Sequence, residues 1–296
     1  MTHIDLERKI KDIKPLSALF EGLKADFKTR IGKPGLPTGI DELDAVLWGV
    51  HRQQVLCIAS RPSEGKTTLG MQLAWNLADT GKSVYFISLE MSRHQLVERL
   101  LCNLMSIRNT DLRSGAITAE THTKIGLFEK LLRESKPKLT ITDNIGYDYT
   151  EIEQVIKHLS SKPDIIILDY IQLCSLGRHG SRVESISEYV RALKQLSVEM
   201  DAAVILLSQI NRGVRERSDR RPLLEELKGS GTLEEHCDTV ALLYWVSRNE
   251  GDCADPTEYE VNIAKQRHGP TMTVKLKFLP QFYRIESRPV SPESRR

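Results

Sequence analysis

Short segments that are almost wholly apolar alternate along this chain with longer segments whose apolar residues recur at helical spacing. A continuous apolar run of this length is typical of a parallel strand buried on both faces. Such runs predict strands over residues 55–59, 83–89, 165–168 and 202–207, with a shorter one over 139–142. Helical spacing predicts helices over about 69–78, 92–105, 120–133, 150–159 and 185–200. Because strands and helices alternate, we expect an α/β fold: a twisted, mainly parallel sheet with helices on both faces.

The pattern changes toward the carboxyl end of the chain. Strands are expected over residues 239–245, 259–264 and 273–278, with a short helix over 232–237. The last two strands flank K-Q-R-H-G-P at residues 265–270, which predicts a hairpin with the cations Lys265 and Arg267 at its tip. We therefore expect an antiparallel hairpin at one edge of the sheet. The polar tail 289–296 is expected to be disordered.

Residues 1–31 form a separate region in this pattern. Apolar residues recur there at roughly helical spacing, interrupted by Pro15, which predicts an amphipathic arm too short to hold a core of its own. The arm either folds back on its own domain or docks on a neighbouring subunit, and the sequence leaves both open. A turn rich in glycine and proline then leads into one domain over 32–288, which begins with a short capped helix at 38–47.

Composition narrows the class of protein. Hydrophobic residues make up 40% and charged residues 28% of the chain, as in a soluble globular protein. The net charge of +2 is nearly balanced, so any nucleic-acid binding must come from local patches. The start of the chain has no apolar signal core, no apolar run reaches the length of a membrane span, and no two of the five cysteines have zinc-site spacing. We expect a cytoplasmic protein with no membrane partner.

One stretch, S-R-P-S-E-G-K-T-T at residues 60–68, carries the clearest chemistry. It lies between an expected strand and an expected helix, which is the setting of a phosphate-binding loop. In such a loop, backbone N–H groups and a helix N-terminus surround the phosphates, Lys66 bridges the β- and γ-phosphates, and Thr67 binds Mg²⁺. Ser60 replaces the first glycine of the usual pattern, whereas Gly65 is present where the backbone approaches phosphate. The expected nucleotide-binding residues are Ser60, Arg61, Pro62, Ser63, Glu64, Gly65, Lys66, Thr67 and Thr68.

Polar side chains stand at or just after the ends of three expected strands: Glu90, Asp169 and Gln209. In an open α/β sheet, ligands bind at the carboxyl ends of the strands. Glu90 is a candidate for polarising the attacking water, Asp169 for holding Mg²⁺ with Thr67, and Gln209 for sensing the γ-phosphate. The alternatives are that Glu90 only complements a helix dipole and that Asp169 is an ordinary strand-terminal acid.

Three basic segments are candidates for contacts with a nucleic-acid backbone. Their candidate residues are Arg178 and Arg182 in the first, Arg212 and Arg215 in the second, and Lys228, Gly229, Ser230 and Gly231 in the third. The second segment, 212–221, is alternatively a solvated, mobile loop, and it holds no aromatic residue for base stacking.

A fourth candidate surface lies on the helix expected at 92–105. Gln95, Arg99 and Asn103 are four residues apart and so share one helix face. This face either reaches the base of the nucleotide or is solvated, and periodicity alone favours the solvated interpretation.

Six motifs occur in the order found in the C-terminal motor domain of DnaB-type replicative DNA helicases, and the chain resembles that domain, which has a RecA-like P-loop NTPase fold. The motifs are A-S-R-P-S-E-G-K-T-T, F-I-S-L-E-M-S, I-I-I-L-D-Y-I-Q-L, L-L-S-Q-I-N-R, L-K-G-S-G-T-L-E-E, and A-K-Q-R-H-G-P-T with K-F-L-P-Q-F-Y-R. The resemblance covers about residues 38–287, and in this family a small residue often replaces the first glycine of the phosphate loop.

The resemblance implies roles for particular residues. It implies ATP and Mg²⁺ as cofactors, Glu90 as catalytic base, Asp169 as the Mg²⁺ partner, Gln209 as γ-phosphate sensor and Arg99 as a contact to the base. It also implies that Lys265 and Arg267 act across a subunit interface, Arg267 as an arginine finger. Residues 228–231 match a DNA-contacting loop, although here Lys-Gly replaces its usual Arg-Glu pair.

The function implied is an ATP-driven helicase that forms a ring, expected to be a hexamer, and moves 5′ to 3′ on single-stranded DNA to unwind duplex during replication. A helicase loader and a primase are further candidate partners. Such helicases usually carry an N-terminal domain that binds primase, whereas here about thirty residues, similar to the family's linker helix, precede the motor. A compact motor suits a phage or mobile-element system, which the methionine start favours, or a fragment of a longer protein.

Two other functions remain for comparison. A non-unwinding RecA-like ATPase, acting as a recombination mediator or an assembly switch, is the main alternative. The sequence K-Q-R at 265–267 favours the helicase, because a finger acting in trans couples hydrolysis around a ring. A small-molecule kinase is disfavoured, because nothing in the sequence suggests a second substrate pocket or a lid.

Overall fold

The computed structural model describes residues 14–30, 35–143, 148–169, 182–210, 219–227, 230–250 and 255–288. The chain divides into two compact units, Met1–Gly35 and Leu36–Arg296. In the first unit, helix α2 (Leu16–Arg30) begins directly after Pro15, whose carbonyl accepts a hydrogen bond from the N–H of Leu19 (3.2 Å). The apolar side chains of Leu16, Leu19, Phe20 and Leu23 are exposed on this helix. A helix is therefore present in the arm, and its docking on a neighbouring subunit stays a prediction.

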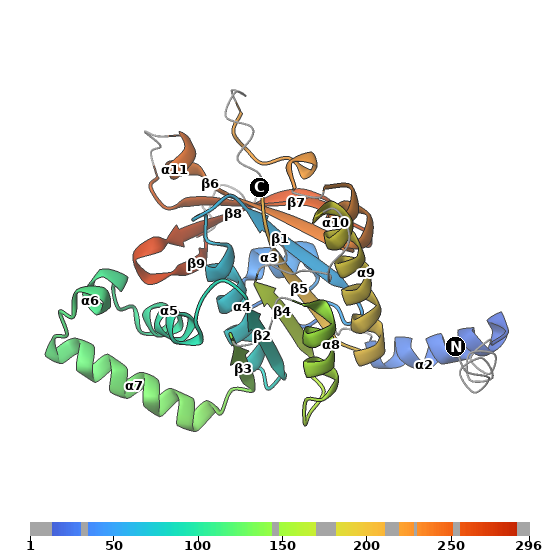
Figure 1. Cartoon of the computed structure of the whole chain (residues 1–296), viewed down its shortest axis with the longest axis horizontal. Coiled ribbons are helices and arrows are strands. Elements are labelled where there is room, and N and C mark those ends of the chain that lie inside the picture. Colours follow the sequence, from blue (N-terminus) through green and yellow to red (C-terminus); the bar gives the residue numbers. More distant parts are fainter. Residues whose placement is uncertain are drawn as a thin grey trace. The chain divides into compact units, whose positions relative to one another are not determined.

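The second unit is built on a nine-stranded sheet in the order β3-β2-β4-β5-β1-β6-β7-β8-β9 (Figure 1). Six strands are paired in parallel: β1 (Val55–Ser60), β2 (Val84–Ser88), β3 (Leu139–Thr142), β4 (Ile165–Asp169), β5 (Ala203–Gln209) and β6 (Thr239–Trp245). Beyond β6 the pairing is antiparallel through β7 (Glu258–Gln266), β8 (Met272–Leu279) and β9 (Arg284–Ser287). The mainly parallel sheet is confirmed, and its antiparallel edge is wider than the expected hairpin because β9 pairs with β8.

The register of the parallel strands brings their polar ends together. Ser60, the last residue of β1, lies opposite Gln209 of β5, and Ser88 at the end of β2 lies opposite Asp169 of β4. All four residues therefore lie at the same edge of the sheet, where ligands of α/β proteins bind.

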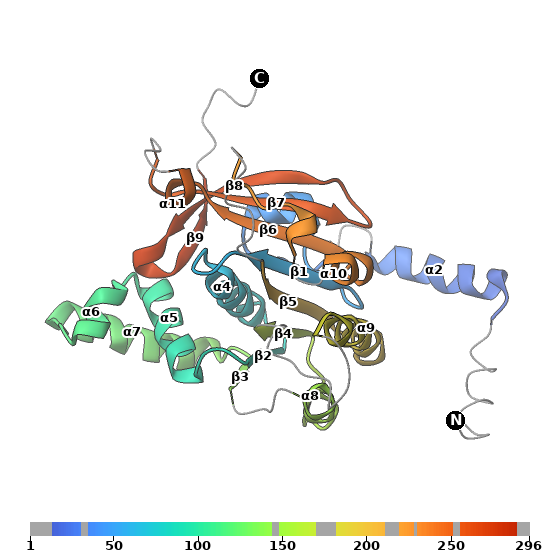
Figure 2. The same ribbon diagram turned by 45° about the horizontal axis from the view of Figure 1, so that its top comes forward.

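Helices cover both faces of the sheet, and Figure 2 shows α4 and α9 on opposite sides of the central strands. One core takes side chains from α3 (Asp41–Leu47), α4 (Lys66–Asp79), α5 (Arg93–Met105) and α7 (Ala119–Ser135). The other takes side chains from α8 (Tyr149–Lys157), α9 (Arg182–Met200) and α10 (Ser230–His236). Leu56 and Ile58 of β1 belong to the first core, and Val55, Cys57 and Ala59 belong to the second. Burial on both faces explains the continuous apolar run that marks this strand.

The expected helix cap at residue 38 is wrong. Helix α3 begins at Asp41 after Ile40, whose side chain makes no cap hydrogen bond. The Thr38 hydroxyl instead accepts a hydrogen bond from the N–H of Ile40 (3.2 Å), while Asp44 accepts one from the N–H of Thr38 (2.8 Å). The turn before α3 is thus held by a side chain reaching back from the helix.

Several short elements have no counterpart among the predicted ones. They are α6 (Asn109–Ser114), α11 (Val246–Glu250), β9, and the 3₁₀ turns Leu224–Glu226 and Pro280–Phe282. Each is too short to show a period of its own in the sequence. Among the helices of the described ranges, none has both the length and the apolar character needed to cross a membrane.

Candidate functional site

A cleft with a volume of about 350 Å³ lies at the carboxyl ends of the parallel strands. This volume is within the range of small-molecule sites, roughly 300–1,000 Å³. The lining residues come from the β1–α4 turn, the β2–α5 connection, the end of β5 and the antiparallel strands. They are Ser60, Arg61, Pro62, Ser63, Gly65, Lys66, Thr67, Thr68, Glu90, Met91, Arg99, Asn109, Gln209, Trp245, Phe278, Pro280 and Tyr283.

The turn between β1 and α4 has the backbone shape that a phosphate-binding loop requires. Ser63 and Gly65 both adopt left-handed conformations, with φ of 64° and 91°, and α4 begins at the next residue, Lys66. A Cβ atom on Gly65 would lie 3.2 Å from the hydroxyl oxygen of Tyr259, so this position needs glycine both for its φ and for space. The turn presents backbone N–H groups and the N-terminus of a 14-residue helix to an anion.

Four side chains meet at the start of α4. Asp169, fully buried at the end of β4, accepts hydrogen bonds from the Thr67 hydroxyl (2.7 Å) and from the Lys66 ammonium group. The Glu90 carboxylate lies 3.9 Å from the same ammonium nitrogen, and its side chain is half exposed (50%). The structure thus brings together the lysine and threonine of the loop with the two acids expected at strand ends.

The residues present fit a magnesium ion bound together with a nucleotide. Magnesium prefers oxygen ligands and is usually held by one or two carboxylates plus substrate phosphates. Thr67 and Asp169 supply a hydroxyl and a carboxylate that already lie within hydrogen-bond distance of each other. Among the described residues, no group of three or more His, Cys, Asp or Glu side chains forms a dedicated metal cage.

Glu64, one of the nucleotide-binding residues expected from the sequence, is a buried acid in the middle of the phosphate loop, and its side chain does not belong to the described lining of the cleft. Its Oε1 atom accepts a hydrogen bond from the Asn249 amide (2.7 Å), and its backbone carbonyl accepts one from the Tyr259 hydroxyl (2.6 Å). Its Oε2 atom is buried without a hydrogen-bond partner among the described residues. Burial raises the pKa of this carboxyl group despite the hydrogen bond from Asn249. The side chain therefore supports the loop from beneath and does not face the cleft with the other lining residues.

The α5 face that periodicity predicted to be solvated is partly buried, so that prediction is wrong. The Arg99 guanidinium lies 4.8 Å from the ring centre of Tyr283 and lines the cleft, and burial lowers its pKa. The Asn103 amide donates to the backbone carbonyl of Tyr283 (2.6 Å). Gln95 instead completes a capping box with Ser92 at the start of α5. The covering turn comes from the far end of the chain, which a local pattern does not reveal.

Gln209 lies where the sequence placed it, at the end of β5 and in the lining of the cleft. The next residue, Ile210, forms an antiparallel bridge with Leu227. The neighbouring Glu226 carboxylate lies 3.7 Å from the Arg61 guanidinium. The end of β5 and the phosphate loop are therefore both tied to the segment that precedes residue 228.

Lys265 and Arg267 are held away from the cleft, near the end of α10. The Lys265 ammonium group donates to the carbonyl of Cys237 (2.9 Å), and burial lowers its pKa. The Arg267 guanidinium donates to the carboxylate of Asp238 (3.2 Å) and to the carbonyl of Glu235 (2.6 Å), and its side chain is 42% exposed. Neither residue belongs to the described lining of its own chain's cleft.

Most residues expected to contact DNA lie outside the described residues: Arg178, Arg212, Arg215, Lys228 and Gly229. Of the others, Arg182 is the first residue of α9, and Ser230 and Gly231 are the first two residues of α10.

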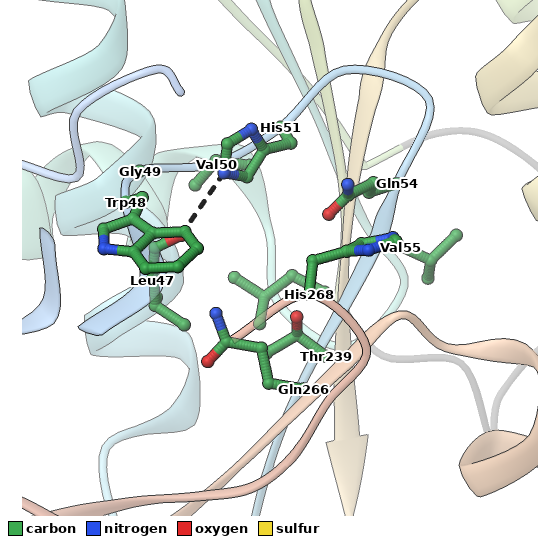
Figure 3. A pocket seen from close by; sticks show the side chains of 11 residues that line it. Leu47, Trp48, Gly49, Val50, His51, Gln54, Val55, Thr239, Gln266 and His268 are labelled. Atoms are coloured by element: carbon green, nitrogen blue, oxygen red, sulfur yellow. Dashed lines mark hydrogen bonds between the residues drawn. The ribbon is translucent and has the colours of Figure 1, made fainter. Parts of the chain in front are cut away.

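A second, smaller cavity lies at the opposite end of β1 (Figure 3). Trp48, His51 and Gln54 line it from before β1, and Gln266 and His268 line it from the end of β7 and beyond. The His51 ring is hydrogen-bonded to the carbonyl of Leu47 (3.3 Å), shown as the dashed line in Figure 3. This cavity lacks the loop, the helix N-terminus and the strand-end acids of the cleft.

The residues that close the cleft from the antiparallel side were not predicted. Arg248 and Asn249 of α11 contact the phosphate loop, and Trp245, Phe278 and Tyr283 add aromatic surface to the cleft. The only signal in the sequence is the aromatic-rich stretch F-L-P-Q-F-Y at 278–283, which by itself does not indicate what it covers.

The sequence of this chain is similar to a known protein family and to individual members of it. The family described as the DnaB-like helicase C terminal domain matches residues 35–287. The replicative DNA helicase DnaC of Bacillus subtilis is 37% identical over 280 residues, which is 93% of this chain and 61% of the relative. The replicative DNA helicase DnaB of Geobacillus stearothermophilus is 36% identical over 253 residues, covering 84% of this chain and 55% of the relative. The chain thus spans little more than half the length of these relatives.

Solved structures agree with the sequence matches. One of them, described as an ATPase domain, aligns with a TM-score of 0.86 and 29% identity, covering 94% of this chain and all of that one. A DnaB-like replicative helicase studied with its interactions with primase aligns with a TM-score of 0.83 and 29% identity, covering 94% of this chain and 68% of the other. The RecA-like fold expected from the motifs is confirmed.

Proposed function

Since this chain belongs to the DnaB-like helicase C-terminal domain family, we propose that it is the motor of a ring-forming replicative helicase. It binds ATP with Mg²⁺, hydrolyses the nucleotide, and uses the cycle to move 5′ to 3′ along single-stranded DNA and separate the duplex. The relatives are DNA helicases by name, and the direction of movement follows from the resemblance in the motifs.

The observation that carries the proposal is the cluster at the start of α4. Lys66, Thr67 and Asp169 lie within hydrogen-bond contact, with the half-exposed Glu90 carboxylate beside them. Phosphoryl transfer needs little covalent help from a protein, because positioning and neutralisation of charge supply most of the rate. The cluster meets these two requirements at the end of a phosphate loop: it supplies a cation, a hydroxyl, a buried acid and an acid that water can reach.

Each residue has a part in this mechanism. The loop N–H groups and Lys66 bind the β- and γ-phosphates, and Thr67 with Asp169 would hold the magnesium ion. The ion, when bound, neutralises charge on the phosphate oxygens. Glu90 accepts a proton from the attacking water and orients it, which its exposure to solvent permits. Gln209, on the strand beside the phosphate loop and in the lining of the cleft, senses the γ-phosphate.

The transition state needs one more cation, and we assign it to a neighbouring subunit. Arg267 is outside the described lining of its own cleft and is held by Asp238 and by a carbonyl of Glu235. Its side chain is 42% exposed, so it is accessible to a second copy. Arg267 then acts as a finger on the neighbour's γ-phosphate, with Lys265 beside it. A finger in trans requires a neighbouring subunit at every site, which a closed ring supplies, and we propose six subunits for that ring.

The remaining parts of the proposal concern partners and location. Single-stranded DNA binds the basic segments 178–182, 212–221 and 228–231, through phosphate contacts. One similar solved structure is a replicative helicase studied with primase, and we carry primase, and a loader, over as candidate partners. We expect the protein to act in the bacterial cytoplasm, where its named relatives replicate DNA.

A forked-substrate assay tests the proposal. The purified chain is incubated with ATP, Mg²⁺ and a fork carrying a 5′ or a 3′ single-stranded tail, while native mass spectrometry measures the assembly. We expect strand separation only with the 5′ tail, together with a hexamer. ATP hydrolysis stimulated by DNA without strand separation would favour the non-unwinding ATPase, and a stable monomer with full activity would contradict the ring.

A further inference from the structure

The short helix α11 touches two parts of the molecule that the mechanism treats separately. It follows β6 directly, and because β6 is parallel to β1, its start lies at the same edge of the sheet as the phosphate loop. Its residues contact the phosphate loop on one side and the segment 219–221 on the other. Segment 219–221 closes the arginine-rich stretch that the sequence assigns to DNA.

On the side of the phosphate loop, α11 makes two hydrogen bonds to consecutive residues. The Arg248 guanidinium donates to the carbonyl of Ser63 (2.7 Å). The Asn249 amide donates to the carboxylate of Glu64 (2.7 Å), a residue that is only 2% exposed. Ser63 has a left-handed backbone, a conformation that costs a non-glycine residue about 1 kcal/mol or more and persists only when neighbours hold it. The helix therefore braces the strained part of the loop.

On the other side, α11 holds both arginines of segment 219–221. The Arg220 guanidinium donates to the backbone carbonyl of Asn249 (2.7 Å). The Arg221 guanidinium donates to the Glu250 carboxylate (2.8 Å) and forms a forked pair with Glu260 (2.6 and 3.0 Å). Two hydrogen bonds of the forked type fix the orientation of a guanidinium as well as its position. Segment 219–221 is thus attached to α11 and to the buried Glu260 of β7.

Asn249 is the residue at which the two sets of contacts meet. Its amide group binds the phosphate loop through Glu64, and its carbonyl accepts the hydrogen bond from Arg220. The same amide also donates to the carbonyl of Trp245 (2.9 Å), which fixes its orientation on the helix. Any shift of the loop on nucleotide binding moves the acceptor of this amide and so acts on the helix that holds Arg220.

We propose that Asn249 is a positioning residue that couples occupancy of the phosphate loop to segment 219–221, so that nucleotide and single-stranded DNA affect each other's affinity through α11. The inference rests on the proposed function, since it requires that both ligands bind. In this proposal the neutral amide of Asn249, outside the nucleotide cleft, links the two binding sites and takes no part in the chemical step. Coupling of this kind is reciprocal, so it is measurable from either ligand.

The experiment measures the coupling factor directly. The dissociation constant of a fluorescent oligo-dT is measured with and without a non-hydrolysable ATP analogue, and that of the analogue with and without oligo-dT. For the parent protein we expect each ligand to change the affinity of the other by at least about fivefold. For Asn249→Ala we expect a coupling factor below about twofold, whatever the change in its affinity for either ligand alone.

A matched control lies on the same helix. The Ser247 hydroxyl of α11 donates to the carbonyl of Pro256 (2.7 Å), which belongs neither to the phosphate loop nor to segment 219–221, so Ser247→Ala should keep the parent coupling factor. Should Asn249→Ala fold poorly, Arg220→Ala removes the exposed end of the same connection and is expected to lower the factor as well. The coupling factor is a ratio of two dissociation constants of the same variant, measured with and without the second ligand. A DNA contact that is lost in both measurements therefore does not change the factor.

The outcomes separate this inference from the proposed function. A parent protein that binds no oligo-dT would overturn both, whereas a parent that binds both ligands without coupling would overturn the role of Asn249 and leave the proposed function to the strand-separation assay. A parent that couples while Asn249→Ala and Arg220→Ala keep its coupling factor would overturn only the role of Asn249. A variant with weaker nucleotide binding but an unchanged coupling factor would show that α11 merely supports the loop, and would also overturn it.

Discussion

At the scale of single residues, the chemistry of the cleft depends most directly on Glu90. We expect Glu90→Gln to lower the ATPase rate by about 10²–10⁴-fold, the usual contribution of a general base. Binding of ATP should stay within about threefold, because the phosphate loop is untouched and only a half-exposed group 3.9 Å from Lys66 changes. Steady-state hydrolysis and titration with a fluorescent nucleotide measure the two effects.

Glu98→Gln is the matched control for this prediction, since Glu98 lies on α5 beyond the capping box and is not part of the described lining of the cleft. It should hydrolyse ATP like the parent. Hydrolysis at the parent rate by Glu90→Gln would instead assign the base to another group.

Gly65 and Gly81 have similar left-handed backbones but different surroundings, so alanine variants of the two distinguish the cost of the backbone conformation from the cost of a steric contact. Gly65 and Gly81 have φ of 91° and 83°, but an added Cβ would meet Tyr259 at Gly65 and open space at Gly81. Both alanine variants should lose about 1–2 kcal/mol of stability from the left-handed backbone. Only Gly65→Ala should also lose nucleotide affinity, by about tenfold or more, because the loop must move away from the Tyr259 hydroxyl.

Thermal unfolding and nucleotide titration of the two variants test this difference. Equal nucleotide affinity in both variants would mean that the loop tolerates a side chain at Gly65, contrary to its closeness to Tyr259.

At the scale of elements, Asp238 joins three of them at the end of the central strands that lies away from the cleft. Its buried carboxylate accepts hydrogen bonds from the N–H of Val55 in β1 (2.8 Å), from Lys194 of α9 (2.7 Å) and from Arg267 after β7 (3.2 Å). Asp238→Ala leaves these donors without their acceptor. We expect a loss of about 3 kcal/mol, at the low end for a broken buried pair because both cations are partly exposed.

Urea unfolding measures this loss, with Asp79→Ala as the control. Asp79 is an exposed acid at the end of α4, and its removal should change stability by less than about 0.5 kcal/mol. Equal midpoints for the two variants would show that Asp238 does not hold these elements together.

The three basic segments expected to contact DNA also act as elements, and the sequence predicts that they make DNA binding depend on salt. Single-strand affinity should fall steeply with salt, because each neutralised phosphate releases counterions. Replacing both Arg212 and Lys228 by alanine should reduce the slope of log K against log salt by about 1.4. The control removes Lys130 and Arg133, which are 68% and 72% exposed on α7 and paired with glutamates of that helix.

Fluorescence anisotropy with oligo-dT over a series of salt concentrations gives the slopes. A slope unchanged by the first pair, or reduced equally by the control pair, would place the path of the DNA elsewhere.

The sequence predicts the strands and helices better than it predicts the residues that cover the cleft. Strands β1, β2, β4, β5 and β6 are marked by apolar runs that are buried on both faces, whereas the edge strand β3 is only partly buried. Lys66, Glu90, Asp169 and Gln209 lie together because parallel strands end at one edge. Arg99 looked solvated because the turn that covers it comes from Tyr283, far along the chain. Helix α11 has too few residues for a period, so its contacts with the loop appear only in three dimensions.

At the scale of the whole molecule, the position of Arg267 predicts that active sites are completed between subunits. Neither Lys66→Ala nor Arg267→Ala should hydrolyse ATP alone, because a guanidinium in this role contributes about 10³–10⁵ in rate. In mixed rings, some interfaces place an intact Lys66 opposite an intact Arg267. Mixing the two inactive proteins should therefore restore part of the DNA-stimulated ATPase activity.

A mixture of parent and mutant shows independently whether subunits exchange. If they exchange and the two mutants together stay inactive, either Arg267 acts in its own subunit or every site must be intact. The double mutant mixed with parent distinguishes these cases, because strict sequential firing predicts that one inactive subunit stops the ring.

The strand order of the sheet also determines when a newly made chain can fold. Strand β1 is finished at Ser60, yet its neighbours β5 and β6 begin only at Ala203 and Thr239. At rates of synthesis of about 5–20 residues per second, β1 waits roughly 7–30 s for its first partner. Throughout that time an apolar strand has both edges open, and the nucleotide loop lacks Asn249 and Tyr259. The strand on which the nucleotide site is built therefore waits unpaired for longer than any strand made after it.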